Sequence, residues 1–362
     1  MSLRKTTLLA GLTISRQMVL TLGVMVLAAL APWLVSAYEL NLLARFLAMG
    51  LLAMGLVLVW GQGGILSLGQ GVFFGLGGYA IALHMKLAAL GDGELPDFMV
   101  WSGLDALPWW WVPFRNPLVA LAGVVLVPGV VAAAFSWSVF RRRVGGVYFA
   151  LITQALALAF ATLLISQQPS TGGFNGLTDF QTLFGVDLGD AAHGLYWLTL
   201  ALVAGVFLAL RALMASRYGM LLRAIRDGEN RIRFLGYDPT PFKVVAFTIG
   251  AVLAGLAGAL FTLHAGVVSP ALVGVVPSIE MVIWVAVGGR NSLAGAVAGT
   301  LLINLAKDGV SSAFPDLWLY ALGLVFVLVV TLLPGGLAGL VTDAGASVWG
   351  RRLKSIIVGD TK

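Results

Sequence analysis

Long apolar runs separated by short polar segments dominate the chain. A helix of about 20 apolar residues crosses a bilayer core, and ten segments are candidates for such spans. We expect them near residues 18–37, 42–60, 71–90, 117–140, 147–166, 195–215, 244–264 and 317–333, with two short spans within 275–306. The short spans meet at Gly288-Gly289-Arg290-Asn291, which interrupts the apolar run. The pattern predicts an all-α polytopic membrane protein of about ten transmembrane helices, some of them broken at glycine-rich points.

Composition supports the membrane assignment. Of the 362 residues, 59% are apolar and only 10% are charged, whereas soluble domains carry roughly 25% charged residues. The net charge of +6 does not indicate nucleic-acid binding here, because an excess of Lys and Arg in a membrane protein marks its cytoplasmic loops. The chain has no cysteine and three scattered histidines, so we expect neither a metal site nor catalytic residues nor a cofactor.

The positions of the charges predict a topology. With a cytoplasmic N-terminus, 18 of the 22 basic residues fall on inner segments, and the outer loops carry mostly acidic residues. Four basic residues fall elsewhere: Arg45, Lys86, Arg115 and Lys307. Counts of eight or nine spans would move some basic clusters to the wrong side. We therefore expect ten spans with both termini in the cytoplasm.

This topology divides the chain into three parts. Residues 1–17 form a cytoplasmic tail, 18–340 a single transmembrane domain, and 341–362 a second cytoplasmic tail. The domain includes outer loops at 91–116 and 167–194 and a long cytoplasmic loop at 216–241. A cleaved signal peptide is the alternative for the first run, but that run is long and lacks a small-residue cleavage site.

Glycine is concentrated where the second and third spans meet. Residues 61–71 contain five Gly, two Gln and one Ser, and each Gly costs about 1 kcal/mol in a helix interior. One interpretation is a broken helix whose backbone lines a cavity. The alternative is tight helix packing, which the spacings Gly71-x-x-x-Gly75 and Gly295-x-x-x-Gly299 also fit. The sequence leaves both interpretations open.

Few polar side chains lie within the spans, and almost none of them ionises. Glu280 is the one candidate for ion coupling. In the alternative interpretation, Ser278 caps a helix whose positive end Glu280 faces. The scarcity of carboxylates within the spans predicts a solute that is neutral at its reacting groups. It also predicts that the energy for transport comes from outside this chain.

The cytoplasmic loop has the features of a docking helix. Ser216 is positioned to cap a first helix, Gly228 interrupts it, and Gly236 ends a second helix. Leu221, Leu222 and Ile225 fall on one face, with Arg223 and Arg226 pointing elsewhere. Such an amphipathic helix can dock in a groove of another protein, while a basic loop lying on anionic lipid is the alternative. The ordered caps favour docking.

Several motifs, taken in order, match one known family. They are the Gly/Gln-rich stretch 61–80, Gly146-Val147-Tyr148-Phe149-Ala150 with Thr153, Thr171-Gly172-Gly173, Ala224-Ile225-Arg226-Asp227 to Gly236, Lys243, and Gly288-Gly289-Arg290. On these motifs the chain resembles the permease subunits of branched-chain amino-acid-type ABC importers, the LivM class. Asn291-Ser292 departs from the Gly-Thr usual in that class.

Further motifs resemble the urea ABC transporter permeases within that class. They are residues 95–100, Leu107-Pro108-Trp109-Trp110-Trp111, residues 152–156, residues 231–237 and residues 278–289. The resemblance implies an importer subunit for urea, with branched-chain amino acids as the alternative solute. An ATP-independent channel or ion-coupled carrier is the alternative from another class.

The resemblance also implies partners and a location. A second, different permease would complete the solute path, two cytoplasmic ATPase subunits would supply energy, and a periplasmic solute-binding protein would deliver solute, all at a bacterial inner membrane. The chain is then a transport subunit and not an enzyme, since it lacks a G-x-x-x-x-G-K-[ST] phosphate loop.

Two sets of site residues follow. The residues expected to couple to the ATPases are Ser216, Gly219, Leu222, Ala224, Ile225, Arg226, Asp227 and Gly236. Those expected along the solute path are Gln62, Gln70, Thr153, Gln154, Glu280 and Asn304.

Overall fold

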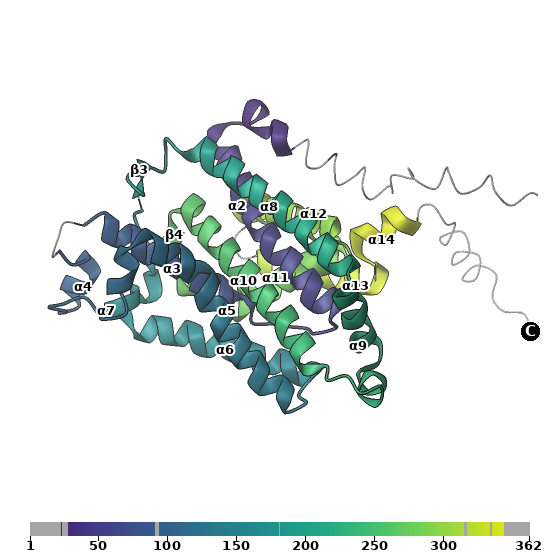
Figure 1. The fold of residues 1–362 in the computed structure, drawn as a ribbon. Helices are drawn as coiled ribbons and strands as arrows, with labels where there is room; N and C mark the ends of the chain where they lie inside the picture. The colour runs from purple at the N-terminus through teal and green to yellow at the C-terminus, as the bar shows by residue number, and fades with distance from the viewer. Residues whose placement is uncertain are drawn as a thin grey trace, which may run out of the picture.

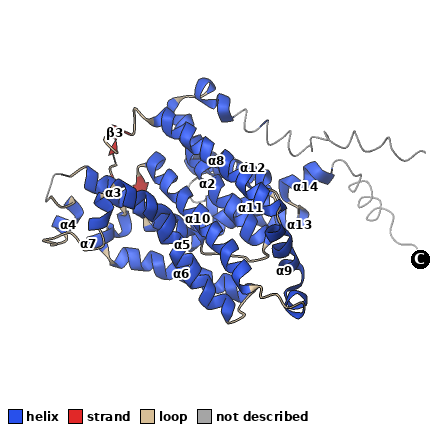
Figure 2. Ribbon diagram, in the orientation of Figure 1, coloured by secondary structure: helices blue, strands red, loops and turns tan. Residues whose placement is uncertain are grey.

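Helices make up most of the described chain, as expected for an all-α membrane protein (Figures 1 and 2). The computed structural model describes residues 23, 28–90, 94–180, 182–314, 317–333 and 335–343. The long helices are α2 (Ala37–Leu56), α3 (Gln70–Ala88), α5 (Pro117–Arg141), α6 (Val147–Ser166), α8 (Ala192–Ala215), α9 (Arg217–Phe234), α10 (Thr240–Ala265), α11 (Val275–Gly288), α12 (Leu293–Ala313) and α13 (Trp318–Leu332).

Shorter elements fill the connections. The short helices are α4 (Asp97–Trp101), α7 (Gln168–Thr171), α14 (Gly336–Asp343), the π-helix η1 (Val57–Gln62) and the 3₁₀ turns η2 (Val112–Arg115), η3 (Gly173–Asn175) and η4 (Pro270–Leu272). Four two-residue strands pair antiparallel as β1 (Leu177–Thr178) with β4 (Val267–Val268) and β2 (Thr182–Leu183) with β3 (Val186–Asp187). The β1–β4 pair joins two loops that are distant in sequence.

Nine of the ten predicted spans correspond to described helices. Within the described residues, seven helices are long and apolar enough to cross a membrane, and α11 and α13 are shorter apolar helices. Of the predicted first span at 18–37, only residues 23 and 28–37 are described, and 28–34 are helical. The tail at 1–17 and most of the tail at 341–362 lie outside the described residues. Seven of the predicted spans are therefore confirmed as helices with the length and composition of a membrane span, and the spans at α11 and α13 stay predictions.

Helix α10 lies at the centre and packs against α2, α3 and α5. The α3–α10 contact is a close approach of two backbones: a Cβ at Gly77 would lie 2.0 Å from the carbonyl oxygen of Gly255, and one at Gly258 would lie 1.8 Å from that of Phe74. Only glycine leaves room for such an approach. The tight-packing interpretation is correct for the spacings on which it was based, because a Cβ at Gly71 would lie 2.5 Å from the carbonyl oxygen of Val273 and one at Gly299 would lie 2.4 Å from that of Trp284.

The broken-helix interpretation is also correct. The span that begins as α2 widens into the π-helix η1 and ends at Gln62, and residues 63–69 are not helical before α3 begins at Gln70. Gly64 has φ +67°, in the left-handed region that favours glycine. The glycine-rich segment thus serves both functions, with breaks at 63–69 and packing contacts on either side.

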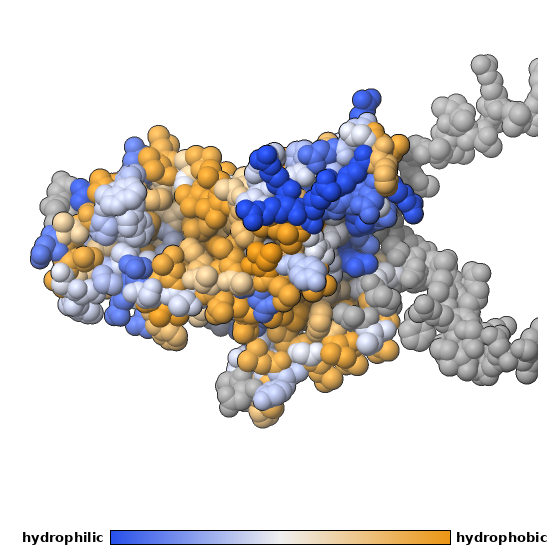
Figure 3. Space-filling view, turned by 90° about the horizontal axis from the view of Figure 1, so that it is seen from below, coloured by the Kyte–Doolittle hydropathy of each residue, from blue (hydrophilic) through white to orange (hydrophobic). Residues whose placement is uncertain are grey.

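The two loop-bearing ends of the molecule are distinct. The short helices α4 and α7 lie at one end of the bundle and α9 lies at the other (Figure 1). Hydrophilic side chains gather around the α9 end, while apolar side chains cover much of the remaining surface seen in Figure 3. Arg143, from the turn after α5, lines the same groove as Asp227, Asn230 and Arg231 of α9. Two of the basic clusters predicted for the inner face therefore lie together.

Candidate functional site

Helix α9 occupies the loop predicted to dock with other proteins. It begins after Ser216, bends at Gly228, where the backbone leaves helical geometry (φ −173°, ψ 72°), and ends at Phe234. Gly236 follows with φ +88°, and the amide of Tyr237 donates to the carbonyl of Ile232, which closes the helix end. The predicted interruption and end are confirmed. Ser216 occupies the N-cap position, but the predicted side-chain cap is absent, because its Oγ donates to Leu213 O instead.

The apolar face of α9 packs against its own chain. Leu222 and Ile225 are 0% and 2% exposed, and Gly219 is buried with no room for a side chain beside the carbonyl of Met214. This face therefore cannot enter a groove of another protein, contrary to what the amphipathic pattern indicated. The apolar surface that α9 does present is at its end, where Phe234 is 91% exposed and Leu235 72%.

Two arginines of α9 bind the end of the first broken helix. Arg223 Nη1 donates to Gln62 Oε1 at 2.9 Å and to the Met214 carbonyl at 3.0 Å. Arg226 Nη1 donates to the carbonyl of Gly61 at 2.5 Å, and its Nε donates to Asp227 Oδ1 at 2.8 Å. This hydrogen bond from Arg226 holds the pKa of the Asp227 carboxyl below its ordinary value. Gln62, expected along the solute path, is therefore bonded to the cytoplasmic loop.

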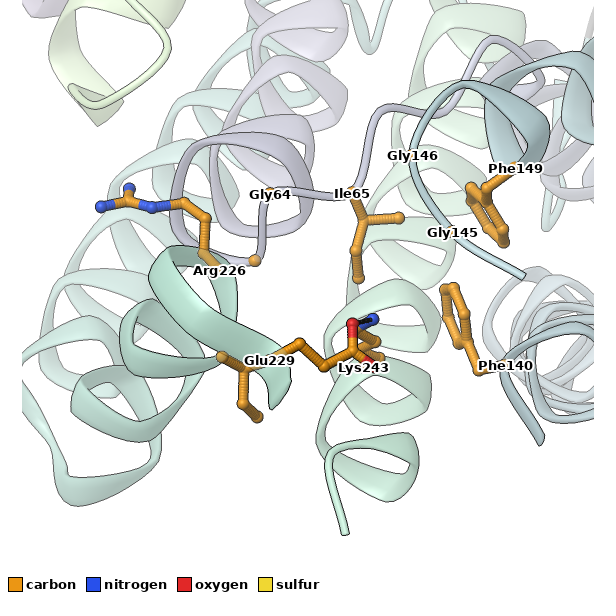
Figure 4. A pocket seen from close by; sticks show the side chains of 11 residues that line it. Gly64, Ile65, Phe140, Gly145, Gly146, Phe149, Arg226, Glu229 and Lys243 are labelled. Atoms are coloured by element: carbon orange, nitrogen blue, oxygen red, sulfur yellow. Dashed lines mark hydrogen bonds and ion pairs between the residues drawn. The ribbon is translucent and has the colours of Figure 1, made fainter. Parts of the chain in front are cut away.

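A cavity of about 140 Å³ separates α9 from the turn between α5 and α6. Figure 4 shows Glu229 of α9 beside Lys243 of α10, with Phe140 and Phe149 opposite. Lys243 and Arg233 both donate to the Glu229 carboxylate. Burial opposes ionisation of that carboxyl, but these two hydrogen bonds outweigh it and hold the pKa of Glu229 below its ordinary value.

The ion pair of Glu229 with Lys243 was not anticipated from the sequence. Glu229 and Arg233 are four positions apart on a helix, a spacing that indicates an ion pair, and they are bonded at 2.9 Å. Lys243 lies at the start of another helix, so no local pattern connects it with Glu229. Together the three side chains attach the second half of α9 to α10.

The two predicted helix breaks are in direct contact. A Cβ at Gly61 would lie 1.9 Å from the carbonyl oxygen of Arg290. The Arg290 guanidinium lies over the ring of Trp60, 5.8 Å from its centroid. Gly289 has φ +113°, a conformation that essentially requires glycine. Glycine is therefore needed at both breaks for this contact to form.

Two predicted path residues, Gln70 and Thr153, lie where α3 begins. The backbone amide of Leu68 donates to Thr153 Oγ1 at 3.0 Å, and that of Gly71 donates to Ser278 Oγ at 3.1 Å. Gln70 lies between them in sequence, is 1% exposed, and has neither of its side-chain polar atoms hydrogen-bonded. The amino-terminal turns of α3 and α11 therefore lie next to each other beside Thr153 of α6.

The remaining predicted path residues lie apart from this point. Gln154 is half-buried on α6, and Asn304 donates to Thr300 O within α12. Glu280 is 5% exposed, accepts from Lys307 Nζ at 2.7 Å and accepts from Trp318 Nε1 at 3.2 Å. Its carboxylate thus has two partners in α12 and α13.

The predicted cap at Ser278 is wrong. Helix α11 begins at Val275, so Ser278 lies in its first turn, and its Oγ donates to Gly274 O. The apolar residues before Ser278 gave no signal of this earlier start. The pairing of Glu280 also explains Lys307, one of the basic residues that the predicted topology left outside the inner segments.

Comparison with known proteins gives a consistent result. Residues 38–330 match the family of permease components of branched-chain amino acid transport systems. The high-affinity branched-chain amino acid permease LivM of Escherichia coli strain K12 is 27% identical over 351 residues, which cover 90% of this chain and 76% of LivM. No solved structure matches significantly.

Two further relatives carry similar names. The permease BraD of Pseudomonas aeruginosa is 24% identical over 298 residues, covering 80% of this chain and 91% of BraD. The permease LivH of Escherichia coli strain K12 is 26% identical over 311 residues, covering 80% of this chain and 90% of LivH. All three relatives are named for high-affinity branched-chain amino acid transport, and these comparisons give the expected urea branch no support.

Proposed function

The chain belongs to the family of permease components of branched-chain amino acid transport systems, and we propose that it forms part of the membrane path of an ATP-driven importer for branched-chain amino acids. The observation that carries this proposal is the extent of the family match, because residues 38–330 cover the seven candidate membrane spans apart from the first residue of α2, and also most of the two shorter apolar helices α11 and α13. The solute named for the relatives replaces urea as the preferred cargo.

The geometry at the start of α3 supports an amino acid as solute. Half-helices that begin at membrane depth direct their amide groups and positive dipole ends at anionic substrate groups in transporters. Helices α3 and α11 bring two such ends together, and the buried, unbonded amide of Gln70 lies at one of them. We assign this point to the solute carboxylate, with Thr153 beside it. The other residues expected along the path lie apart from this point and are not assigned to the carboxylate: Gln62, Gln154, Glu280 and Asn304.

The proposed assembly includes the partners that the resemblance implies. LivM and LivH are both permeases of the same organism and both resemble this chain, which supports a path formed by two different permeases. The apolar end of α9, at Phe234 and Leu235, offers a surface for the ATPase subunits. A periplasmic solute-binding protein would deliver the amino acid. The predicted location is a bacterial inner membrane, with α9 on the cytoplasmic side.

Uptake by the reconstituted complex tests this proposal. The complex of this chain with its second permease, ATPases and binding protein is placed in vesicles, and ATP-dependent uptake of labelled leucine and labelled urea is compared. We expect leucine uptake and no urea uptake. Urea uptake without leucine uptake would contradict the proposed cargo. Uptake by this chain alone, without ATP, would instead support a channel or carrier.

A variant in the same assay tests the assigned carboxylate point. Gln70→Ala should raise the KM for leucine at least about fivefold, because one hydrogen bond to a charged group contributes about 1.5 to 3 kcal/mol. Asn304→Ala, which removes a side chain bonded within its own helix, should leave KM unchanged. An unchanged KM in the Gln70 variant would remove this residue from the path.

A further inference from the structure

The arginines that join α9 to the first helix break are placed to transmit motion. We infer that Arg223 and Arg226 are positioning residues that couple displacement of α9 to the two glycine breaks, and so to the start of α3. This inference rests on the proposed function, in which ATPase subunits act on α9. It assigns to two side chains a role that neither the family match nor the relatives' names specify.

Arg226 provides a hydrogen-bond donor to the end of η1, where the helix stops at the first break. The last carbonyls of a helix lack intrahelical partners, and a buried carbonyl, such as that of Gly61, needs a partner from elsewhere in the protein. The guanidinium of Arg226 donates to the Gly61 carbonyl at the end of η1. Gly64 makes room for the arginine stem, because a Cβ there would lie 2.6 Å from Arg226 Cγ. The segment after the break is therefore shaped around this one side chain.

Arg223 adds a second attachment from the same helix. One nitrogen, Nη1, donates both to Gln62 Oε1 and to the carbonyl of Met214 at the end of α8. Leu222 of α9 is fully buried and faces the break: its Cδ1 atom would lie 3.5 Å from a Cβ added at Gly63. The first half of α9 is thus bonded and packed against residues 61–64, and cannot shift without them.

The bend at Gly228 separates this attachment from a second one. Before the bend, α9 is bonded to the first break through Arg223 and Arg226. After the bend, Glu229 is bonded to Lys243 of α10. The cavity of about 140 Å³ next to Ile225 and Glu229 is lined by Gly145 and Gly146 and leaves space beside the helix. A force applied to the exposed end at Phe234 therefore reaches two different membrane helices.

The first break passes displacement to the second. Gly61 contacts the Arg290 carbonyl without room for any side chain, so the end of η1 cannot move toward that turn without moving it. Arg290 lies in the turn between α11 and α12. Helix α11 in turn contacts the start of α3 through Ser278. Packed elements of this kind transmit small shifts because close-packed interiors do not deform continuously.

Transport and ATP hydrolysis measured in the same vesicles test the inference. In Arg226→Ala we expect normal amounts of assembled complex, ATP hydrolysis within about twofold of the unmodified complex, and leucine uptake reduced at least about tenfold, within the range of allosteric couplings. Arg226→Lys keeps a cationic donor for the Gly61 carbonyl and should recover at least about a third of the uptake. The quantity compared is leucine transported per ATP hydrolysed.

Arg231→Ala provides the matched control. Arg231 is exposed on the same helix, beyond the bend, so its loss should leave the ratio of transport to hydrolysis unchanged. An unchanged ratio in Arg226→Ala would overturn the inference, and so would a parallel fall of assembly, hydrolysis and uptake, since that is the result of a purely structural role. Failure of the proposed function is distinguishable, because the unmodified complex would then show no ATP-dependent leucine uptake.

A distance measurement tests the same link without any solute. The chain has no cysteine of its own, so nitroxide labels at Leu158→Cys on α6 and Leu302→Cys on α12, both exposed, report only the designed pair. A non-hydrolysable ATP analogue should change the distance between the two labels in the complex that retains Arg226. In the complex that carries Arg226→Ala, the analogue should leave this distance unchanged. The same change in both complexes, or no change in either, would overturn the inference.

Discussion

Glu280 illustrates how a side chain's surroundings decide its role. The carboxylate is buried within a span, where an unpaired charge is costly, and it is bonded to Lys307 and to Trp318. A carboxylate with two fixed partners serves to join α11, α12 and α13. This arrangement favours a structural role over the ion coupling considered from the sequence.

Removal of this charge tests the structural role. Glu280→Gln should lower the free energy of unfolding by about 1 to 3 kcal/mol, less than the 3 to 5 typical of a fully buried pair, because the Lys307 side chain is 40% exposed. Thermal unfolding of the purified chain in detergent measures the loss.

A double variant provides the control for Glu280. In Glu280→Gln/Lys307→Met no unpaired ammonium remains, so most of the stability should return. A double variant as unstable as the single one would show that the ion pair is not the cause. A pH-dependent loss of transport in Glu280→Gln with normal stability would instead support ion coupling.

At the scale of elements, glycine sets the distances between helices. At Gly77 and Gly258 the α3 and α10 backbones meet, whereas at Gly61 and Gly289 glycine permits a break and a contact between breaks. The sequence left packing and breaking as alternatives, and the structure shows both, at different positions. Spacing alone did not distinguish them because both need a small residue, and only the facing helix shows which applies.

A pair of glycine variants tests the packing role. Gly77→Ala places a Cβ 2.0 Å from the Gly255 carbonyl oxygen and should lower stability by about 1 to 3 kcal/mol, as overpacking does. Gly205→Ala on α8 has no neighbour within 4 Å of the added Cβ and should be neutral or stabilising by up to about 1 kcal/mol. Melting temperatures in detergent compare the two. Equal melting temperatures would contradict the close approach of α3 and α10.

Helix α9 shows the same limit for amphipathic patterns. The positions of Leu222 and Ile225 correctly predicted one apolar face, and Gly228 and Gly236 correctly predicted the bend and the end. The pattern could not show that this face packs against residues 61–65 of the same chain, because periodicity identifies an apolar face but not the surface that covers it. The coupling role of Ala224, Asp227 and the rest of the helix stays a prediction.

At the scale of the whole molecule, the distributions of charge and of hydropathy both distinguish two opposite ends of the helix bundle. The end with α9 also holds Arg143 and, through the contact of the breaks, Arg290. The opposite end holds α4 and α7 (Figure 1). This separation matches the distribution of basic and acidic segments in the sequence. The orientation in the membrane stays a prediction.

Cysteine labelling tests that orientation. Trp101→Cys, at a position 83% exposed, and Phe234→Cys, at a position 91% exposed, lie at opposite ends of a chain with no other cysteine. A membrane-impermeant maleimide applied to spheroplasts should label position 101, and position 234 only after the membrane is opened. Labelling of position 234 in sealed spheroplasts would reverse the predicted topology.

The sequence by itself determined the fold class, the seven candidate membrane spans of the described residues, both breaks and the position of α9. These depend on local hydropathy, on the length needed to cross a bilayer, and on glycine. The tertiary structure alone decided that Arg226 binds Gly61, that Gly61 meets Arg290, and that Glu280 pairs with Lys307. These contacts join residues far apart in the chain. They depend on how helices face one another, and an apolar run looks the same in sequence whichever neighbour it packs against.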